Sequence, residues 1–273
     1  MEKFRWMELT SRQFKGYILN GGDMAVLPVG SMEVMGPHLP IGSKSFAVKA
    51  LSELICKIHG GLSLPVMPLS PINGKKALGG VGLDYQVTLD YINDAVCEIF
   101  DNGIRRLIIV GFHEELAYVA AEALQLHDIP AVHINPLQMV TAMEGGRHKQ
   151  FNNLIAGSLK LLGEDELLVK MLQANDKCLL EGYTAPDDLQ PIAGLINVVE
   201  SSYCSGVFPH FYGPKEYKIL PSANIDADTA ACTITAWVKD KTNAFEALSK
   251  YCQVFPRTKY ERGLRMGGVD YEK

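Results

Sequence analysis

Short apolar runs alternate with segments of helical periodicity through the first half of the chain, and this alternation constrains the fold most strongly. The clearest run is residues 105–111, where four branched aliphatic residues follow two arginines. A strand that is apolar on both faces is typical of the centre of a parallel sheet. Strands that alternate with helices at this spacing predict βαβ units with right-handed crossovers. The sequence therefore predicts an α/β fold with a mainly parallel sheet flanked by helices.

The expected strands are residues 24–30, 62–69, 105–111 and 131–135. The expected helices are residues 46–59, 88–102, 116–126, 153–173 with a break near Gly163, and 241–252. Residues 226–239 are rich in Ala and Thr, so both helix and strand stay open, with helix favoured. Residues 176–192 are polar and predict a surface excursion. No repeat or linker stands out, so we expect one domain over residues 1–273, with residues 150–273 as its less regular part.

Composition excludes several classes of protein. The 273 residues are 47% hydrophobic, and their formal net charge is −5, with no basic run that would suit nucleic acid. No apolar stretch reaches the roughly 18 residues that a membrane span needs. The first residues lack the apolar core of a secretory signal, and the six cysteines form no CxxC pair. We therefore expect a cytoplasmic protein with reduced thiols that binds neither nucleic acid nor membrane.

Two loops carry the chemistry. Residues 27–44 begin as an apolar run and continue into a segment rich in Gly and Pro that holds Glu33, His38 and Lys44. Such a segment favours an irregular loop rather than a helix. In an open parallel sheet, the loops at the carboxyl ends of the strands line one crevice. The sequence therefore predicts that this loop meets the one that follows residues 105–111.

The second loop contributes His113 and Glu115. Alternate residues of an extended segment point to the same side, so these two are expected to face the crevice while Glu114 turns away. Together with Glu33 and His38 they make two imidazoles and two carboxylates, a ligand set that suits Zn²⁺ or Mn²⁺. The alternative is structural: such a histidine is often a hydrogen-bonded residue, and Glu33 could cap a helix.

Residues 27–44 resemble the first motif of the creatininase family of amidohydrolases, approximately Leu-Pro-x-Gly-Ser-x-Glu-x-His-Gly-Pro-His-Leu-Pro-x-Gly-Thr-Asp. The matching residues are Leu27, Pro28, Gly30, Ser31, Glu33, Gly36, Pro37, His38, Leu39, Pro40 and Gly42. His113 and Glu115 resemble the family's second motif. The resemblance covers about residues 20–165 and implies a single creatininase-like layered domain.

The resemblance also implies a metal site. Family members hold two divalent metals through the Glu, first His and Asp of the first motif and the His and Glu of the second, and a metal-bound water attacks a ring amide. By position, Glu33, His113 and Glu115 carry over, whereas Met35 replaces the first His and Lys44 replaces the bridging Asp. A thioether is a poor ligand for Zn²⁺ or Mn²⁺, and an ammonium repels a cation.

Replacing an aspartate by a lysine raises the charge of the site by two units. The sequence therefore predicts an altered metal site, with one Zn²⁺ or Mn²⁺ on Glu33, His113 and Glu115, and metal-free protein as the alternative. A later family motif with a catalytic His and a Glu matches Phe151 and Ala156 here. An alignment shifted to His148 is open, but it loses the match at Ser158.

The resemblance implies a hydrolase that opens a small cyclic amide or cyclic ketone. The expected catalytic residues are Glu33, His38, Lys44 and Glu115, with Glu33 or Glu115 as general base. In a metal-free variant of the hypothesis, Lys44 pairs with the carboxylates and polarises a carbonyl, or forms a Schiff base with a ketone. The alternative is a catalytically inactive relative that binds a ligand or serves as a scaffold. A small-molecule partner and a homo-oligomer, a hexamer in the family, are also expected.

Overall fold

The computed structural model describes residues 4–71, 79–127, 130–181 and 219–254. The strands are β1 (Met24–Val29), β2 (Leu62–Ser63), β3 (Arg106–Gly111) and β4 (Ala131–Ile134). They form a parallel sheet in the order β2-β1-β3-β4. The helices are η1 (Trp6–Glu8), α1 (Ser11–Leu19), α2 (Ser43–His59), α3 (Tyr85–Asp101), α4 (Leu116–His127), α5 (Leu137–Val140), α6 (Arg147–Leu162), α7 (Asp165–Leu180), α10 (Ala227–Asp240) and α11 (Thr242–Val254). The predicted α/β class with a parallel sheet is confirmed.

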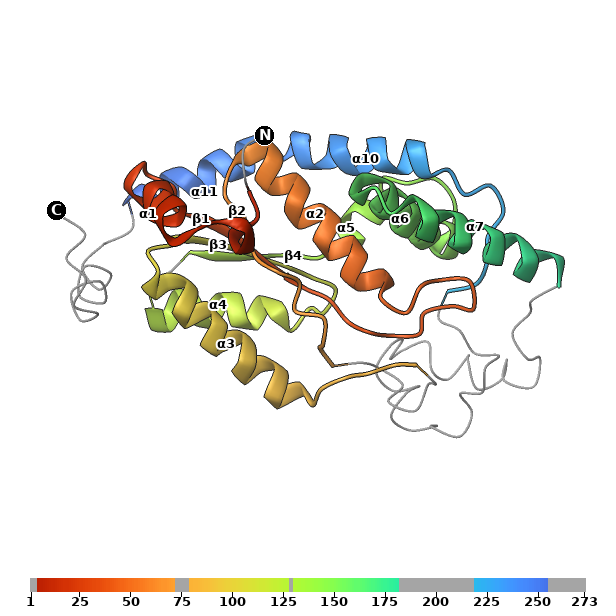
Figure 1. Cartoon of the computed structure of the whole chain (residues 1–273), viewed down its shortest axis with the longest axis horizontal. Helices are drawn as coiled ribbons and strands as arrows, with labels where there is room; N and C mark the ends of the chain where they lie inside the picture. Colours follow the sequence, from red (N-terminus) through yellow and green to blue (C-terminus); the bar gives the residue numbers. More distant parts are fainter. Residues whose placement is uncertain (1–3, 72–78, 128–129, 182–218, 255–273) are drawn as a thin grey trace.

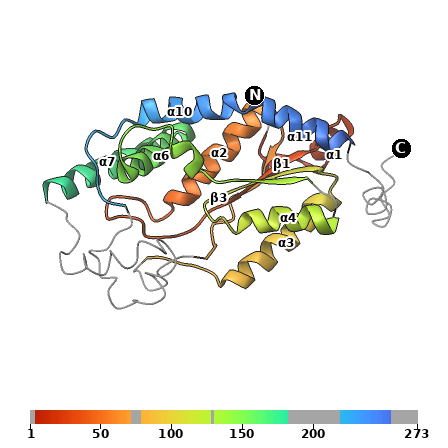
Figure 2. The ribbon, with the colours of Figure 1, turned by 180° about the vertical axis from the view of Figure 1, so that it is seen from behind.

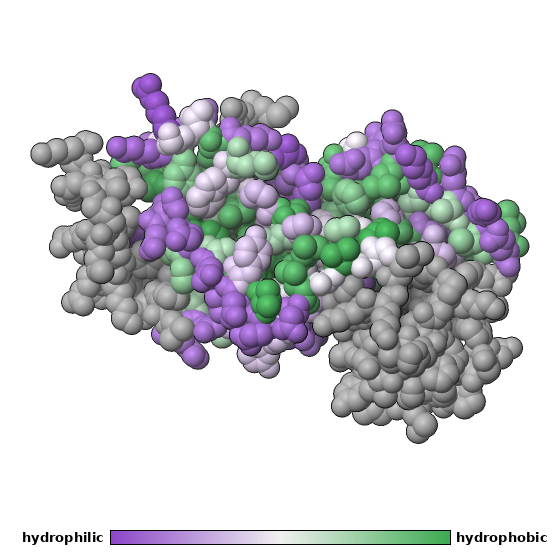
Figure 3. Space-filling view, turned by 60° about the horizontal axis from the view of Figure 1, so that its bottom comes forward, coloured by the Kyte–Doolittle hydropathy of each residue, from purple (hydrophilic) through white to green (hydrophobic). Residues whose placement is uncertain are grey.

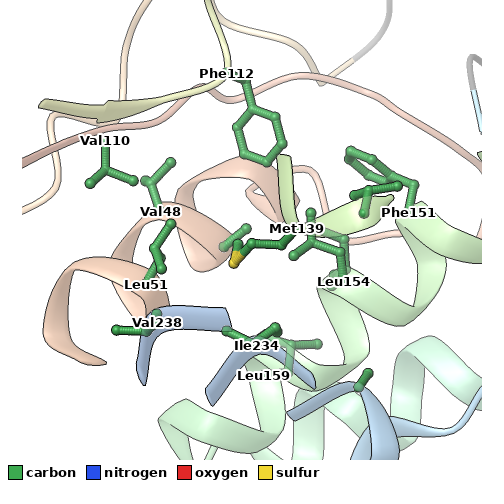
Figure 4. Packing of buried hydrophobic residues seen from close by; sticks show 14 of the residues in the cluster. Val48, Leu51, Val110, Phe112, Met139, Phe151, Leu154, Leu159, Ile234 and Val238 are labelled. Carbon is green, nitrogen blue, oxygen red and sulfur yellow. The ribbon is translucent and has the colours of Figure 1, made fainter. Parts of the chain in front are cut away.

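Helices cover both faces of the sheet (Figures 1 and 2). Helices α2, α6 and α10 lie on one face, and α3 and α4 lie on the other. The buried side chains of β1 alternate accordingly: Met24 and Val26 join the α2–α6–α10 cluster, and Ala25 and Leu27 join the α3–α4 cluster. Figure 4 shows the first cluster, where residues of β3, α2, α6 and α10 meet. Such a strand is apolar along its whole length because both of its faces are buried.

The connections reverse direction at β1. From β1 the chain passes through α2 to β2 on one side, and then through α3 to β3 on the other side of β1. Right-handed crossovers in opposite directions place α2 and α3 on opposite faces of the sheet. The carboxyl ends of β1 and β3 are therefore a topological switch point, where open α/β sheets usually bind ligands.

Most expected elements are found, with differences at their ends. Strand β2 has two residues rather than the expected eight, although Met67 still bridges to Val29, because Pro65 lacks the amide proton that a sheet ladder needs. Residues 226–239 were expected to be helix rather than strand, and they form α10, with Asp226 as its N-cap. The expected excursion over residues 176–192 is wrong in its first part, because α7 continues to Leu180, and the remainder lies outside the described residues.

The face that carries α3 and α4 mixes hydrophilic and hydrophobic side chains (Figure 3). Its large exposed hydrophobic residues include Val87 and Tyr91 on α3 and Tyr118 on α4. The homo-oligomer that the family resemblance implies stays a prediction. Within the described ranges, no helix has the length and apolar character that crossing a membrane requires.

Candidate functional site

A buried ion pair lies at the switch point. The Nζ atom of Lys44 is 2.6 Å from Oε2 of Glu33. Their side chains are only 13% and 3% exposed, so both charges are largely removed from water. Because the pair is shielded, its attraction is much stronger than that of a surface ion pair. The two residues that the sequence placed at the centre of the candidate site are thus in direct contact.

The backbone of the first loop positions this pair. The Glu33 amide donates to the Ile41 carbonyl at 3.1 Å, and the Ser45 hydroxyl donates to the Ser31 carbonyl at 3.0 Å. A side chain at Gly30 would place its Cβ 2.3 Å from Oγ of Ser45, so only glycine lets the loop pass the start of α2 this closely. The loop therefore folds back on α2 and brings Glu33 to Lys44, the second residue of that helix.

Aromatic and apolar side chains surround the pair. The Lys44 ammonium lies 5.7 Å from the ring centroid of Phe112, which follows β3. The Phe112 ring in turn lies 6.1 Å from that of Phe151 on α6, and Figure 4 shows both rings in the same cluster. Met35 is also buried in this cluster. The ammonium thus contacts an aromatic ring on one side and a carboxylate on the other, and both contacts favour a positive charge there.

His113 makes a contact that the sequence reasoning missed. Its Nε2 atom is 3.2 Å from the hydroxyl oxygen of Ser70. Ser70 follows the segment that runs beside β1, so it reaches His113 across the carboxyl end of β1. The signal was available, because Ser70 directly follows the expected strand 62–69 and so belongs to the same edge of the sheet. The hydroxyl holds the imidazole in one orientation at that edge.

The segment with Glu115 is a turn rather than an extended chain. The Leu116 amide donates to the His113 carbonyl, and the Ala117 amide donates to the Glu114 carbonyl, as α4 begins. His113 and Glu115 are half-buried while Glu114 is exposed, and the expectation that the first two face one crevice stays a prediction. Glu115 lies close to the start of α3. The pKa of Tyr85 is raised chiefly by the burial of Tyr85 itself, and the negative charge of Glu115 adds to this effect.

His38 is fully buried and bonded to α6. Its Nε2 atom lies 2.7 Å from Oδ1 of Asn152, whose amide group donates to the Leu220 carbonyl at 3.0 Å. An amide oxygen only accepts, so Nε2 carries the proton and Nδ1 carries a lone pair. No residue in the described part of the chain bonds that Nδ1 atom. Burial lowers the pKa of His38, with the Asn152 bond opposing, and the imidazole is neutral near pH 7.

The two positions that match the family's later motif are part of the core. Phe151 and Ala156 are buried on α6 and have no polar group to offer. His148, the alternative, accepts at Nδ1 from the Leu220 amide at 3.3 Å and so fixes the backbone of residues 219–222. Asn152 and His148 on α6 thus have structural contacts, because both bond the backbone of Leu220 and Asn152 also bonds His38.

The described residues do not fit a metal. None of them form a group of three or more His, Cys, Asp or Glu side chains that could hold an ion, and this includes Glu33, His113 and Glu115 as they are placed. Glu33 is engaged by an ammonium, and Met35 packs into the core. A divalent cation on the paired oxygen of Glu33 would lie within about 5 Å of that ammonium. The repulsion at this distance is about 7 kcal/mol for an effective dielectric constant of about 20.

Comparison with protein families gives a match over residues 7–159 to the family described as creatininase, creatinine amidohydrolase. Among curated proteins, a creatinine amidohydrolase of Pseudomonas putida is 24% identical over 125 residues, which are 44% of this chain and 48% of that protein. The chain thus matches about half of the length of this relative.

Among solved structures, a protein from Bacteroides fragilis NCTC 9343, named as a candidate creatinine amidohydrolase, matches over 91% of this chain and 97% of its own. The TM-score is 0.58, and 15% of the residues are identical. A manganese form of creatininase covers 51% of this chain and 60% of its own, with a TM-score of 0.44 and 20% identity. A mutant creatininase of the Zn-Zn type covers 58% and 72%, with a TM-score of 0.48 and 18% identity.

Proposed function

Since the chain belongs to the creatininase family, we propose that it is a hydrolase that opens the ring of a small cyclic amide or cyclic ketone at the carboxyl ends of β1 and β3. The observation that carries this proposal is the ion pair between Lys44 and Glu33. It keeps a positive charge at the switch point in a shielded setting. Such a charge stabilises the negative charge that develops on a carbonyl oxygen under attack.

The roles divide among the residues of this edge. Glu33 holds the Lys44 ammonium in place, so it acts as a positioning residue rather than as the base. Glu115 is the second carboxylate, half-buried at the start of α4, and it acts as the general base that takes a proton from the attacking water and then gives it to the leaving nitrogen or carbon. His113, held by Ser70, binds and orients the substrate or the water. The scissile bond is the carbonyl carbon–nitrogen bond of an amide or a ring carbon–carbon bond of a ketone.

Names of related structures include manganese and zinc, and those metals are known for those proteins. The residues of this chain do not fit either metal, because Lys44 presents a positive charge and Met35 presents a thioether. No step of the proposed reaction therefore passes through a metal. The altered metal site is part of the proposal.

A second function is favoured by one specific observation. Positions 35, 151 and 156, where family motifs have polar residues, carry Met35, Phe151 and Ala156, and all three are buried in the core. This pattern is expected when a fold is retained and its chemistry is lost. In that case the protein binds a small carbonyl compound without converting it.

The experiment is a hydrolysis assay over a panel of five- and six-membered cyclic amides and cyclic ketones, read by mass spectrometry as the gain of one water. We expect turnover of at least one compound and a loss of about 100-fold or more in Glu115→Gln, the typical share of a general base. Glu114→Gln is the matched control, because Glu114 is the exposed neighbour and its loss leaves turnover unchanged.

Two results would contradict this proposal. Equal turnover in the wild type and in Glu115→Gln would show that Glu115 is not the general base. Ligand-induced thermal stabilisation by a panel member without any hydrolysis would instead support the second function, a binding protein.

A further inference from the structure

A lysine at the second position of a helix is electrostatically unusual. The amino end of α2 already carries the positive end of the helix dipole, and its first turn contains no acidic residue. Lys44 adds a full positive charge at this end. The charge is balanced across the loop by Glu33, which is even more buried than Lys44. The Glu33 carboxylate is therefore already neutralised by a positive charge, that of the Lys44 ammonium.

We propose that Lys44 is a built-in replacement for the metal charge, so that the site at Glu33 excludes divalent cations, and that replacing Lys44 and Met35 raises its affinity for them. The ammonium lies 2.6 Å from a carboxylate oxygen, which is close to the distance at which a metal would approach it. Contact with the Phe112 ring holds the ammonium from the other side. This inference goes beyond the proposed activity, because it concerns metal affinity and holds whether or not substrate is converted.

The geometry also says which residues limit the site. Glu33 follows β1, and His113 and Glu115 follow β3, while Met35 lies on the loop after β1 and Lys44 lies at the start of α2. Met35 presents a thioether, and Lys44 presents a positive charge, so each removes a ligand and the second also repels the ion. The Met35→His and Lys44→Asp substitutions together supply an imidazole and a carboxylate at those two positions.

The test compares the wild type, Lys44→Asp, Met35→His/Lys44→Asp and Lys49→Asp. Lys49 lies one turn further along α2, so Lys49→Asp makes the same change of charge on the same helix away from Glu33. Each full-length protein is incubated with Zn²⁺ or Mn²⁺ and dialysed, and bound metal is measured by mass spectrometry of the elements and by calorimetric titration. Circular dichroism reports folding. None of these measurements uses a substrate, so failure of the hydrolase proposal leaves them unaffected.

The expected result is a wild type and a Lys49→Asp variant without stoichiometric metal, and a double variant that binds at least one ion per chain. Its Kd should be at least about 1,000-fold lower than that of the wild type, which corresponds to about 4 kcal/mol. If the double variant does not fold, Lys44→Asp alone is expected to show a smaller gain of the same sign. Stoichiometric metal in the wild type that is lost in Glu33→Gln would overturn the proposal. A folded double variant with wild-type metal affinity would overturn it equally.

Discussion

The central feature at the scale of single residues is the ion pair of Lys44 with Glu33. A buried pair of this kind contributes little net stability compared with apolar residues of the same size, because removing two charges from water costs about as much as their attraction returns. Removing one partner is costly, however, because the other charge stays buried. A pair that contributes little to folding and lies at a switch point is better explained by function than by stability.

A double-mutant cycle on this pair tests that view. We expect Lys44→Met and Glu33→Leu to lower the free energy of unfolding by about 3–5 kcal/mol each, because each removes the ion-pair partner of a charge that stays buried. Glu33→Leu/Lys44→Met should lose less than either single variant, as measured by urea denaturation. The exposed pair of Arg5 with Glu8 is the control, and Glu8→Gln should cost less than about 1 kcal/mol. Additive losses in the double variant would show that the two side chains are not coupled.

His38 predicts a dependence of stability on pH. Burial lowers its pKa in the folded protein below the value of about 6.5 expected in the unfolded chain. As pH falls through about 6.5, the unfolded chain takes up a proton that the folded protein does not, so stability decreases with falling pH until the folded pKa is reached.

The His38→Gln variant isolates this contribution, because the Gln amide can still donate to Asn152 but does not titrate. Its free energy of unfolding should change less steeply between about pH 6.5 and 5, by up to about 1.4 kcal/mol per pH unit. The half-buried imidazoles of His133 and His148 affect both proteins alike. Parallel stability curves for the variant and the wild type would contradict the assignment.

Sequence reasoning at this scale found the residue types but not all of their contacts. The positions of Glu33 and Lys44 in one loop were enough to suggest that the two could pair. The contact of His38 with Asn152 was not predicted, because these residues are 114 apart in the chain and no local pattern records such a contact. His113 and Ser70 are 43 residues apart, and only their expected place at the same edge of the sheet indicated that they could meet.

At the scale of elements, α6 and α10 cross in close contact within the layer that also holds α2 (Figure 1). A Cβ atom at Gly157 would lie 2.8 Å from the backbone of both Ala230 and Ala231, so the two helices touch through the space that the glycine leaves. Residues 219–226 enter α10 across α6 and α7, where Asn152, Asn153 and Asn175 bond their backbone. This crossing connects the candidate site to the last helices.

Gly157→Ala should therefore destabilise the protein by about 1–3 kcal/mol, since the helices must move apart or strain. Gly16→Ala is the matched control, because Gly16 is also in a helix but has open space around it. The control should gain about 0.5–1 kcal/mol from better helix propensity. Thermal unfolding of the two variants checks the predicted loss of stability in Gly157→Ala and the predicted gain in Gly16→Ala. A neutral or stabilising Gly157→Ala would contradict the close contact of α6 with α10.

Element boundaries were predictable where a stop signal is explicit. Gly103 has a φ of 91°, which ends α3, and Gly163 has a φ of 72° between α6 and α7, as expected from the sequence. Helix α3 begins at Tyr85 rather than at residue 88, because the Asp84 side chain accepts from the Gln86 amide and caps an earlier turn. Helix α1 was not expected, although Thr10 and Gln13 form a capping box, which is a sequence signal for the start of a helix.

At the scale of the whole molecule, the fold class followed from apolar strands that alternate with amphipathic helices, and the place of the site at the carboxyl ends of the strands followed from the parallel sheet. The strand order could not be derived, because periodicity says nothing of which strands pair. The approach of residues 219–222 to the first loop, through the bond from the Ile219 amide to the Met35 carbonyl, also has no sequence signal. The edge of the sheet was thus predictable as the site, whereas its surroundings were not.

The account rests on a lysine ammonium, rather than a metal, as the cation beside Glu33. The most direct test is anomalous X-ray diffraction at the zinc and manganese edges, from wild-type crystals grown with each ion. The account predicts continuous density between Lys44 and Glu33 and no anomalous peak within about 2.5 Å of the Glu33 carboxylate, the range of metal–oxygen bonds. An anomalous peak at that distance, with the Lys44 side chain displaced from Glu33, would contradict it.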